Sequence, residues 1–133
     1  MGNFLQLTAV AGITFVAIDA LWLGVVARNL YRSHLGSMLR EQPQMLAAAG
    51  FYILYILALV FFVIQPAIEK SSWQHALFAG AFFGLVAYAT YDLTNLATLK
   101  SWPLKITIID LAWGALISGI VSLAAYHVGK WLA

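Results

Sequence analysis

Long apolar stretches separated by short polar segments follow one another along the whole chain. A helix needs about 20 apolar residues to cross a bilayer, and four stretches meet that length. They are expected at about residues 4–27, 46–65, 75–99 and 104–132, and the pair Gln65–Pro66 is expected to end the second. The pattern predicts an all-α integral membrane protein, a four-helix bundle in which residues 1–133 form a single transmembrane domain.

The polar segment RNLYRSHLGSMLREQPQ, between the first two stretches, predicts an amphipathic interfacial helix over about 28–42 that ends before Pro43. Its apolar face would hold Leu30, Tyr31, His34, Leu35, Met38 and Leu39. Its polar face would hold Arg28, Arg32, Ser33, Ser37 and Arg40. The simpler interpretation is an anchor whose arginines reach lipid phosphates. The alternative is a clamp for a headgroup or substrate, formed by Arg28, Arg32 and His34.

The composition also indicates a membrane protein. Of the 133 residues 63% are hydrophobic and 9% are charged, whereas soluble domains are typically about half apolar. The absence of cysteine excludes disulfides, thiol catalysis and thiolate metal sites. The net charge of +2 is spread over seven basic residues, which favours membrane lipids as partners and gives no reason to expect nucleic acid.

Basic residues are unevenly divided between the two sides of the predicted bundle. One side carries Arg28, Arg32, Arg40, Lys100 and Lys105, and the other carries Lys70 and Lys130. Loops rich in Lys and Arg stay in the cytoplasm. Both termini are therefore expected outside the cytoplasm.

Three aspartates, Asp19, Asp92 and Asp110, fall inside predicted spans. Each lies five to nine residues from a basic residue of the Arg-rich side, which places all three about 8–14 Å inside the same membrane face. The motifs IDALW and IDLAW each put a tryptophan, Trp22 or Trp113, three residues after the aspartate. Three helices thus deliver carboxyl groups to one layer.

Other polar groups are expected near this layer. Tyr52 and Tyr55 of FYILY bring phenols from the second span. The third span places small and polar residues on one face, as helices do where they meet other helices: Gly80, Gly84, Ala87, Tyr88, Tyr91, Asp92 and Asn95. A carboxyl group inside a membrane costs about 2.5–3.5 kcal/mol and is a functional candidate. Because no basic residue lies nearby in the spans, at least one aspartate is expected to be protonated at neutral pH, or a cation to be shared. The simpler interpretation is that hydrogen bonds from phenols, indoles and water fasten the bundle.

The segments IDALWLG, AAAGFYILY, GLVAYATYDLTNLATLKSWP and DLAWG resemble the bacterial membrane protein family known as domain of unknown function 2177. The likeness covers nearly the whole chain, and YDLTNLATL followed by WP is its most specific part. The resemblance implies a small four-helix protein of the bacterial inner membrane, whose termini would then be periplasmic. It supplies no activity, substrate or cofactor, but it suggests genomic company with fatty-acid-modifying and flavin-dependent proteins, which favours lipids.

Three classes of function stay open. In the first, the protein binds or acts on a lipid or isoprenoid-like substrate that enters sideways; Asp92 would be the general acid or base, Asp19 and Asp110 would tune it or bind a hard cation, and Tyr52 or Tyr55 would donate a proton. Substrate contacts would come from Asn95, Trp22, Trp113, Tyr88, Tyr91, Arg28 and Arg32. In the second, a transporter or channel component uses the acids as a proton or cation relay. In the third, the chain is a structural partner, and a homo-oligomer or a larger membrane complex is compatible with all three classes.

Overall fold

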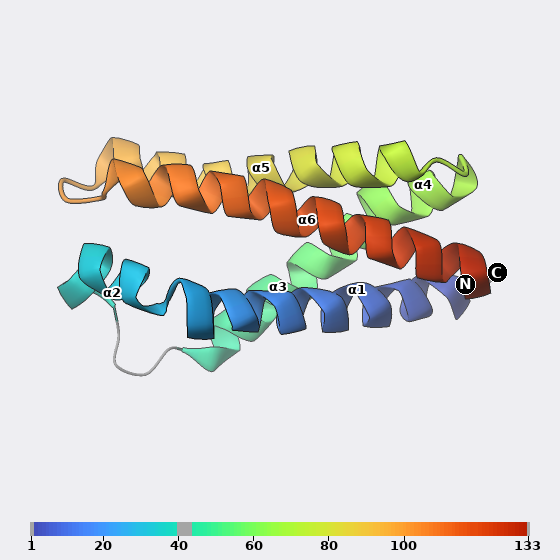
Figure 1. Ribbon diagram of the computed structural model, residues 1–133, viewed down its shortest axis with the longest axis horizontal. Coiled ribbons are helices and arrows are strands. Elements are labelled where there is room, and N and C mark those ends of the chain that lie inside the picture. Colours follow the sequence, from blue (N-terminus) through green and yellow to red (C-terminus); the bar gives the residue numbers. More distant parts are fainter. Residues whose placement is uncertain (1, 40–43, 133) are drawn as a thin grey trace.

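The computed structural model describes residues 2–39 and 44–132, and within these ranges every regular element is a helix (Figure 1). The first half contains α1 (Gly2–Leu21), the π-helical turn η1 (Trp22–Val26), α2 (Arg28–Leu35) and the 3-10 turn η2 (Gly36–Met38). The second half contains α3 (Met45–Leu59), the π-helical turn η3 (Val60–Ile64), α4 (Gln65–Glu69), α5 (Trp73–Thr98) and α6 (Leu104–Leu132). Four segments are long and apolar enough to span a membrane: Phe4–Val26, Met45–Glu69, Trp73–Thr98 and Leu104–Leu132. The predicted all-α bundle of four spanning helices is confirmed.

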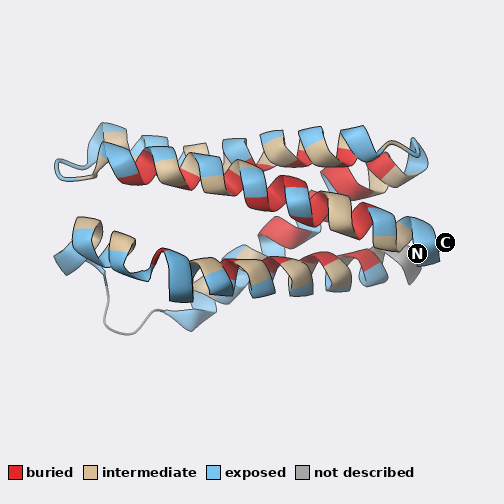
Figure 2. Cartoon of the chain, viewed as in Figure 1, coloured by how far each residue is buried: buried red, intermediate tan, exposed pale blue. Residues whose placement is uncertain are grey.

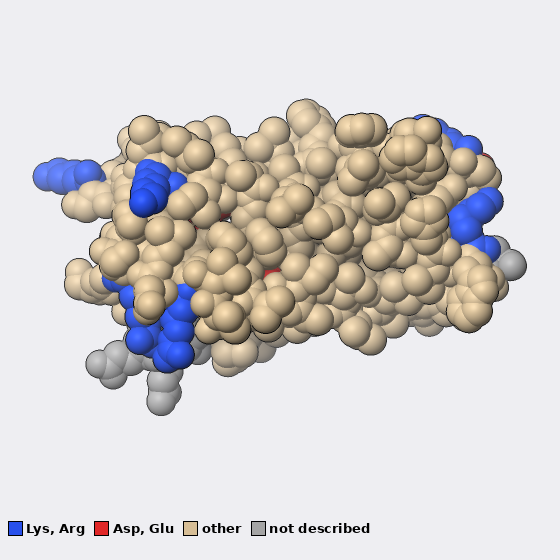
Figure 3. Space-filling model, in the orientation of Figure 1, with Lys and Arg blue, Asp and Glu red and all other residues tan. Residues whose placement is uncertain are grey.

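The bundle has two distinct ends (Figure 1). One end carries α2 and the turn between α5 and α6, and we call it the α2 end. The other carries α4 and both chain termini, and we call it the terminal end. On the face drawn in Figure 3, Lys and Arg gather at these two ends and leave the middle uncharged apart from a few carboxylate atoms. This distribution is what a protein that crosses a bilayer requires.

Helices α5 and α6 form a tight antiparallel hairpin because glycine and serine face each other across it. A Cβ atom on Gly80 would lie 2.6 Å from Ser122 Oγ, and one on Gly84 would collide with the carbonyl oxygen of Gly114 and with Ser118. Small residues at such spacing let two helix backbones approach closely inside a membrane. The close fit fixes the register of the two helices.

The hydrophobic core lies between α1, the α3–η3 segment and α6. Phe15, Leu59, Ile64, Ile117 and Val121 each have an exposed fraction of 0%. Buried positions follow the faces that the helices turn toward one another (Figure 2). This packed region fills the middle of the bundle and separates its two ends.

The predicted end of the second span at Gln65–Pro66 is wrong. The helix widens into η3 and continues as α4 to Glu69, with Pro66 in the first turn of α4. A proline is tolerated there because its missing N–H falls where the regular hydrogen-bond ladder is already interrupted.

The predicted interfacial helix is shorter than expected. Helix α2 ends at Leu35 because Gly36 adopts a φ of +40°, a left-handed conformation that suits glycine and stops a helix. Over the part that forms, Arg28 and Arg32 are exposed while Tyr31 and the other apolar-face residues are half-buried. Met38 and Leu39 are exposed beyond the helix. Residues 40–43, with Arg40 and the expected stop at Pro43, lie outside the described residues.

Candidate functional site

A cavity of about 670 Å³ lies at the α2 end of the bundle. Its walls come from all four spanning segments, from α2 and from the turn between α5 and α6. They consist of Asp19, Trp22, Leu23, Tyr31, Leu35, Phe51, Tyr52, Ala87, Tyr88, Thr90, Tyr91, Asp92, Trp102, Asp110 and Trp113. Eight of these fifteen residues are aromatic and three are acidic, and none is basic. Carboxyl groups in an aromatic surrounding therefore define the site.

Asp19 is held by two donors from two other helices. The Tyr52 hydroxyl donates to Oδ2 at 2.6 Å, and the Trp113 indole donates to Oδ1 at 3.1 Å. The Trp113 ring in turn stacks on Trp22, with ring centroids 4.4 Å apart and an interplanar angle of 11°. Asp19 thereby connects α1 with α3 and α6, and both of its oxygens have partners.

Asp110 is bound from α2. The Tyr31 hydroxyl donates to Asp110 Oδ1, and the Trp22 indole donates to the Tyr31 oxygen at 3.3 Å. Burial and the hydrogen bond to Asp110 raise the pKa of Tyr31, so its phenol stays protonated. The chain of hydrogen bonds from Trp22 through Tyr31 to Asp110 fixes α2 over this end of the site.

Asp92 differs from the other two acids. Its exposed fraction is 0%, and the Asp110 carboxyl and the Trp102 indole lie beside it. Neither of its oxygens, however, makes a hydrogen bond of standard geometry to a residue that the structure describes. Buried polar atoms without such a bond are rare and require an explanation. Asp92 is therefore the carboxyl group with hydrogen-bonding capacity left for a ligand.

Most of the residues singled out in the sequence meet at this cavity. Those that line it are Asp19, Asp92, Asp110, Tyr52, Trp22, Trp113, Tyr88 and Tyr91. The helical rise per residue was sufficient to predict that the three acids lie near one another, because each spanning helix runs along most of the length of the bundle.

Other predicted site residues lie elsewhere. Tyr55 is deeper than Tyr52 on α3, buried in the core, where its hydroxyl bonds to Ser118. Asn95 lies beside Tyr91 but does not line the cavity. Arg28 and Arg32 are exposed and do not line the cavity either, so a clamp formed by them would lie outside the cavity. The ring of His34, the third member of that clamp, bonds to the backbone oxygen one turn earlier in α2.

Two hydrogen-bonding aromatic residues of the cavity, Tyr31 and Trp102, are not among the predicted site residues. Tyr31 lies on the apolar face of α2, and that face covers the cavity. Trp102 lies just before Pro103 in the turn between α5 and α6, where it lines the cavity, donates to Thr107 at 3.1 Å and packs edge-to-face on Tyr91. The position of Trp102 in the WP pair, within the most family-specific stretch, was the available signal.

The three acids are also candidate ligands of a metal ion. Among the residues described, no group of three or more His, Cys, Asp or Glu side chains is arranged to hold a metal ion. A hard cation such as Ca²⁺ needs several oxygens at about 2.3–2.6 Å. A cation shared by Asp19, Asp92 and Asp110 therefore stays a hypothesis, and its ligands would need to be completed by other oxygens.

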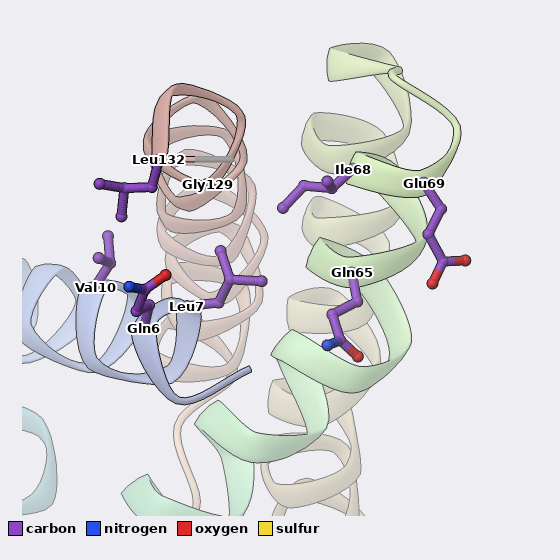
Figure 4. Close-up of a pocket in the computed structure, with 8 residues that line it drawn as sticks. All are labelled: Gln6, Leu7, Val10, Gln65, Ile68, Glu69, Gly129 and Leu132. Atoms are coloured by element: carbon purple, nitrogen blue, oxygen red, sulfur yellow. The ribbon is translucent and has the colours of Figure 1, made fainter. Parts of the chain in front are cut away.

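A second, much smaller cavity of about 120 Å³ lies at the terminal end between α1, α4 and α6 (Figure 4). Between the two cavities, α1 buries Ala11 and Phe15, and α6 buries Ile117, Val121 and Ala125, each with an exposed fraction of 0%. The acidic cavity is therefore closed on the side that faces the middle of the bundle.

Four spanning helices around an acidic, aromatic cavity define an all-α integral membrane protein. The family model described as "Predicted membrane protein (DUF2177)" matches residues 4–127, and the chain belongs to this family. No curated protein and no solved structure matches the chain. The family membership agrees with the resemblance seen in the sequence and assigns no activity to the cavity.

Proposed function

We propose that this protein is a multi-pass protein of the bacterial inner membrane that binds a lipid or isoprenoid-like amphiphile in its acidic cavity. The observation that carries the proposal is the cavity itself. Its volume of about 670 Å³ falls within the range of about 300–1,000 Å³ typical of small-molecule sites. Its wall is largely apolar, and its three acids are expected at one level near a membrane face, as the tail and head of an amphiphile require.

The packing of α3 supports entry from the side. The Tyr55 and Phe83 rings, with centroids 5.7 Å apart, join α3 and α5 in the hydrophobic core, and neither lines the cavity. Closer to the α2 end, Phe51 of α3 and Tyr91 of α5 both line the cavity and have exposed fractions of 49% and 58%. Aromatic side chains exposed in a spanning segment face lipid. An apolar tail could then enter between α3 and α5 while its head reaches the acids.

A reaction at the bound head would use Asp92 as the proton acceptor or donor, because its oxygens are not engaged by standard hydrogen bonds. Asp19 and Asp110 already accept hydrogen bonds from the hydroxyl groups of Tyr52 and Tyr31, respectively. These two acids would orient the ligand and keep the site rigid.

A proton- or cation-coupled transporter component is the second candidate, and the layer of three acids is the observation that favours it. The closed core below the cavity argues against a path across the bundle in this conformation. Uptake by protein-containing liposomes that depends on a pH gradient would support transport. A lack of such uptake, with lipid bound in the cavity, would favour the first proposal.

The test is identification of co-purifying lipid by native mass spectrometry of protein released from mild detergent. Ala87 lines the cavity and is half-buried, so Ala87→Trp should fill it and remove the bound species. Ala112 is exposed on α6, so Ala112→Trp makes the same change on the lipid-facing surface and should keep it. Equal lipid retention by both variants would contradict binding in the cavity.

A further inference from the structure

We infer that the cavity selects an amphiphile whose headgroup is an ammonium cation carrying N–H donors. The inference rests on the proposed binding of an amphiphile and adds the class of its head. Three features of the site support it. They are the negative charge of its walls, the Asp92 oxygens that lack standard hydrogen bonds, and the arrangement of aromatic rings.

The charged residues that line the cavity, in the part of the chain that the structure describes, are all acidic. They are Asp19, Asp92 and Asp110, and no Lys, Arg or His of the described residues joins them. A phosphate or carboxylate head would place a further negative charge beside these acids in a region of low dielectric, where like charges disfavour each other. An ammonium group instead permits neighbouring carboxylates to be ionised together. The walls therefore disfavour anionic lipids.

Asp92 provides the position for the head. It is fully buried at the cavity wall, and its two oxygens lack standard hydrogen bonds to the described residues. Asp19, by contrast, already accepts hydrogen bonds from Tyr52 and Trp113. An alkylammonium group brings three N–H donors and a positive charge, as the lysine side chain does. It would satisfy Asp92 without displacing the donors of Asp19.

The aromatic rings distinguish a cation from an uncharged alcohol. Trp22 and Trp113 stack in parallel at the cavity, and Tyr91 and Trp102 meet edge-to-face on another wall. Ring faces attract cations, tryptophan most strongly, and the attraction increases when water is excluded. A hydroxyl head would satisfy Asp92 but gain little from these rings. The described residues present no group of three metal-ligating side chains, and an organic cation does not need short metal–oxygen bonds.

The experiment compares three probes with the same alkyl chain: dodecylammonium, dodecanol and dodecanoate. The protein is placed in nanodiscs of phosphatidylcholine, and binding is followed by tryptophan fluorescence because Trp22, Trp102 and Trp113 line the cavity. Empty nanodiscs and the cavity-filled Ala87→Trp variant correct for partition into the bilayer, and Ala112→Trp, which keeps the cavity, controls for the added tryptophan. Dodecylammonium should bind about tenfold more tightly than dodecanol, and dodecanoate should bind most weakly.

Variants of the protein separate the contribution of the Asp92 charge from that of the aromatic rings. Asp92→Asn should abolish most of the preference for ammonium over alcohol. Trp22→Leu keeps every charge and should reduce the same preference by several-fold, which gives a second test if the Asp92 variant does not fold. Equal or tighter binding of dodecanol that Ala87→Trp abolishes would overturn the cationic headgroup and leave the proposed amphiphile site standing. Probe binding that Ala87→Trp does not change would overturn both.

Discussion

The Tyr52 hydroxyl donates to Asp19 Oδ2 at 2.6 Å and so joins α3 to α1 at the wall of the acidic cavity. Trp113 of α6 donates to the other oxygen of the same carboxyl group. Asp19 is thus an acceptor shared by three helices, whereas Asp92, on the fourth, has no comparable bond among the described residues. All three acids line the cavity, but Asp19 and Asp110 also hold helices together through hydrogen bonds, whereas Asp92 makes no such bond of standard geometry to the described residues.

This difference between Asp19 and Asp92 predicts that two matched substitutions change the free energy of unfolding differently. Asp19→Ala leaves two donors unpaired and should lower the free energy of unfolding by about 1–3 kcal/mol for each buried donor. Asp92→Ala removes a buried carboxyl group beside an existing cavity and should leave stability unchanged or slightly higher. Thermal unfolding in the same detergent measures both. A melting temperature for Asp92→Ala as low as that of Asp19→Ala would show that Asp92 also fastens the helices.

Tyr31→Phe should loosen α2 without unfolding the spanning helices. The substitution removes the hydroxyl that donates to Asp110 and accepts from Trp22, and these bonds tie the short α2 to the bundle. Amide hydrogen exchange in α2 should become faster while exchange in α6 is unchanged. Tyr91→Phe, at a more exposed tyrosine of the same cavity, is the control. Unchanged exchange in α2 would mean that apolar contacts alone hold it in place.

Gly84→Ala should weaken the α5–α6 hairpin. Its new methyl group would collide with the Gly114 carbonyl oxygen and with Ser118, and overpacking of this kind costs about 1–3 kcal/mol. Gly50 in α3 has no atom within 4 Å of an added Cβ. Gly50→Ala is therefore the control, and it should stabilise the helix by up to about 1 kcal/mol. Denaturant titration of the two variants checks the difference, and similar stabilities would contradict a tight glycine contact.

The fold and the layer of acids could be predicted from the sequence because both depend on local rules. Apolar length identifies a spanning helix, and the rise per residue converts a position such as Asp110 into a depth. Tyr31 could not be assigned in this way, since its role depends on α2 folding back against α6. Tyr55 was placed at the right helix but the wrong depth, as its hydroxyl reaches Ser118 in the core. Which residue of another helix a side chain contacts depends on how the helices pack together, and helical periodicity does not specify that packing.

The orientation in the membrane gives the last prediction. The α2 end carries Arg28, Arg32, Lys100 and Lys105, so the positive-inside rule predicts that this end and the acidic cavity lie toward the cytoplasm. The chain contains no cysteine, so single cysteines can report accessibility without a background signal.

Ser37 at the α2 end and Gln74 at the terminal end are both exposed and uncharged, so Ser37→Cys and Gln74→Cys leave the charge bias intact. A membrane-impermeant maleimide should label Gln74→Cys in intact cells and label Ser37→Cys only after permeabilisation, and the cysteine-free parent should stay unlabelled. The reverse pattern would place the cavity on the periplasmic side, and an amphiphile would then reach it from the outer leaflet. Labelling of both variants in intact cells would indicate two orientations in one population.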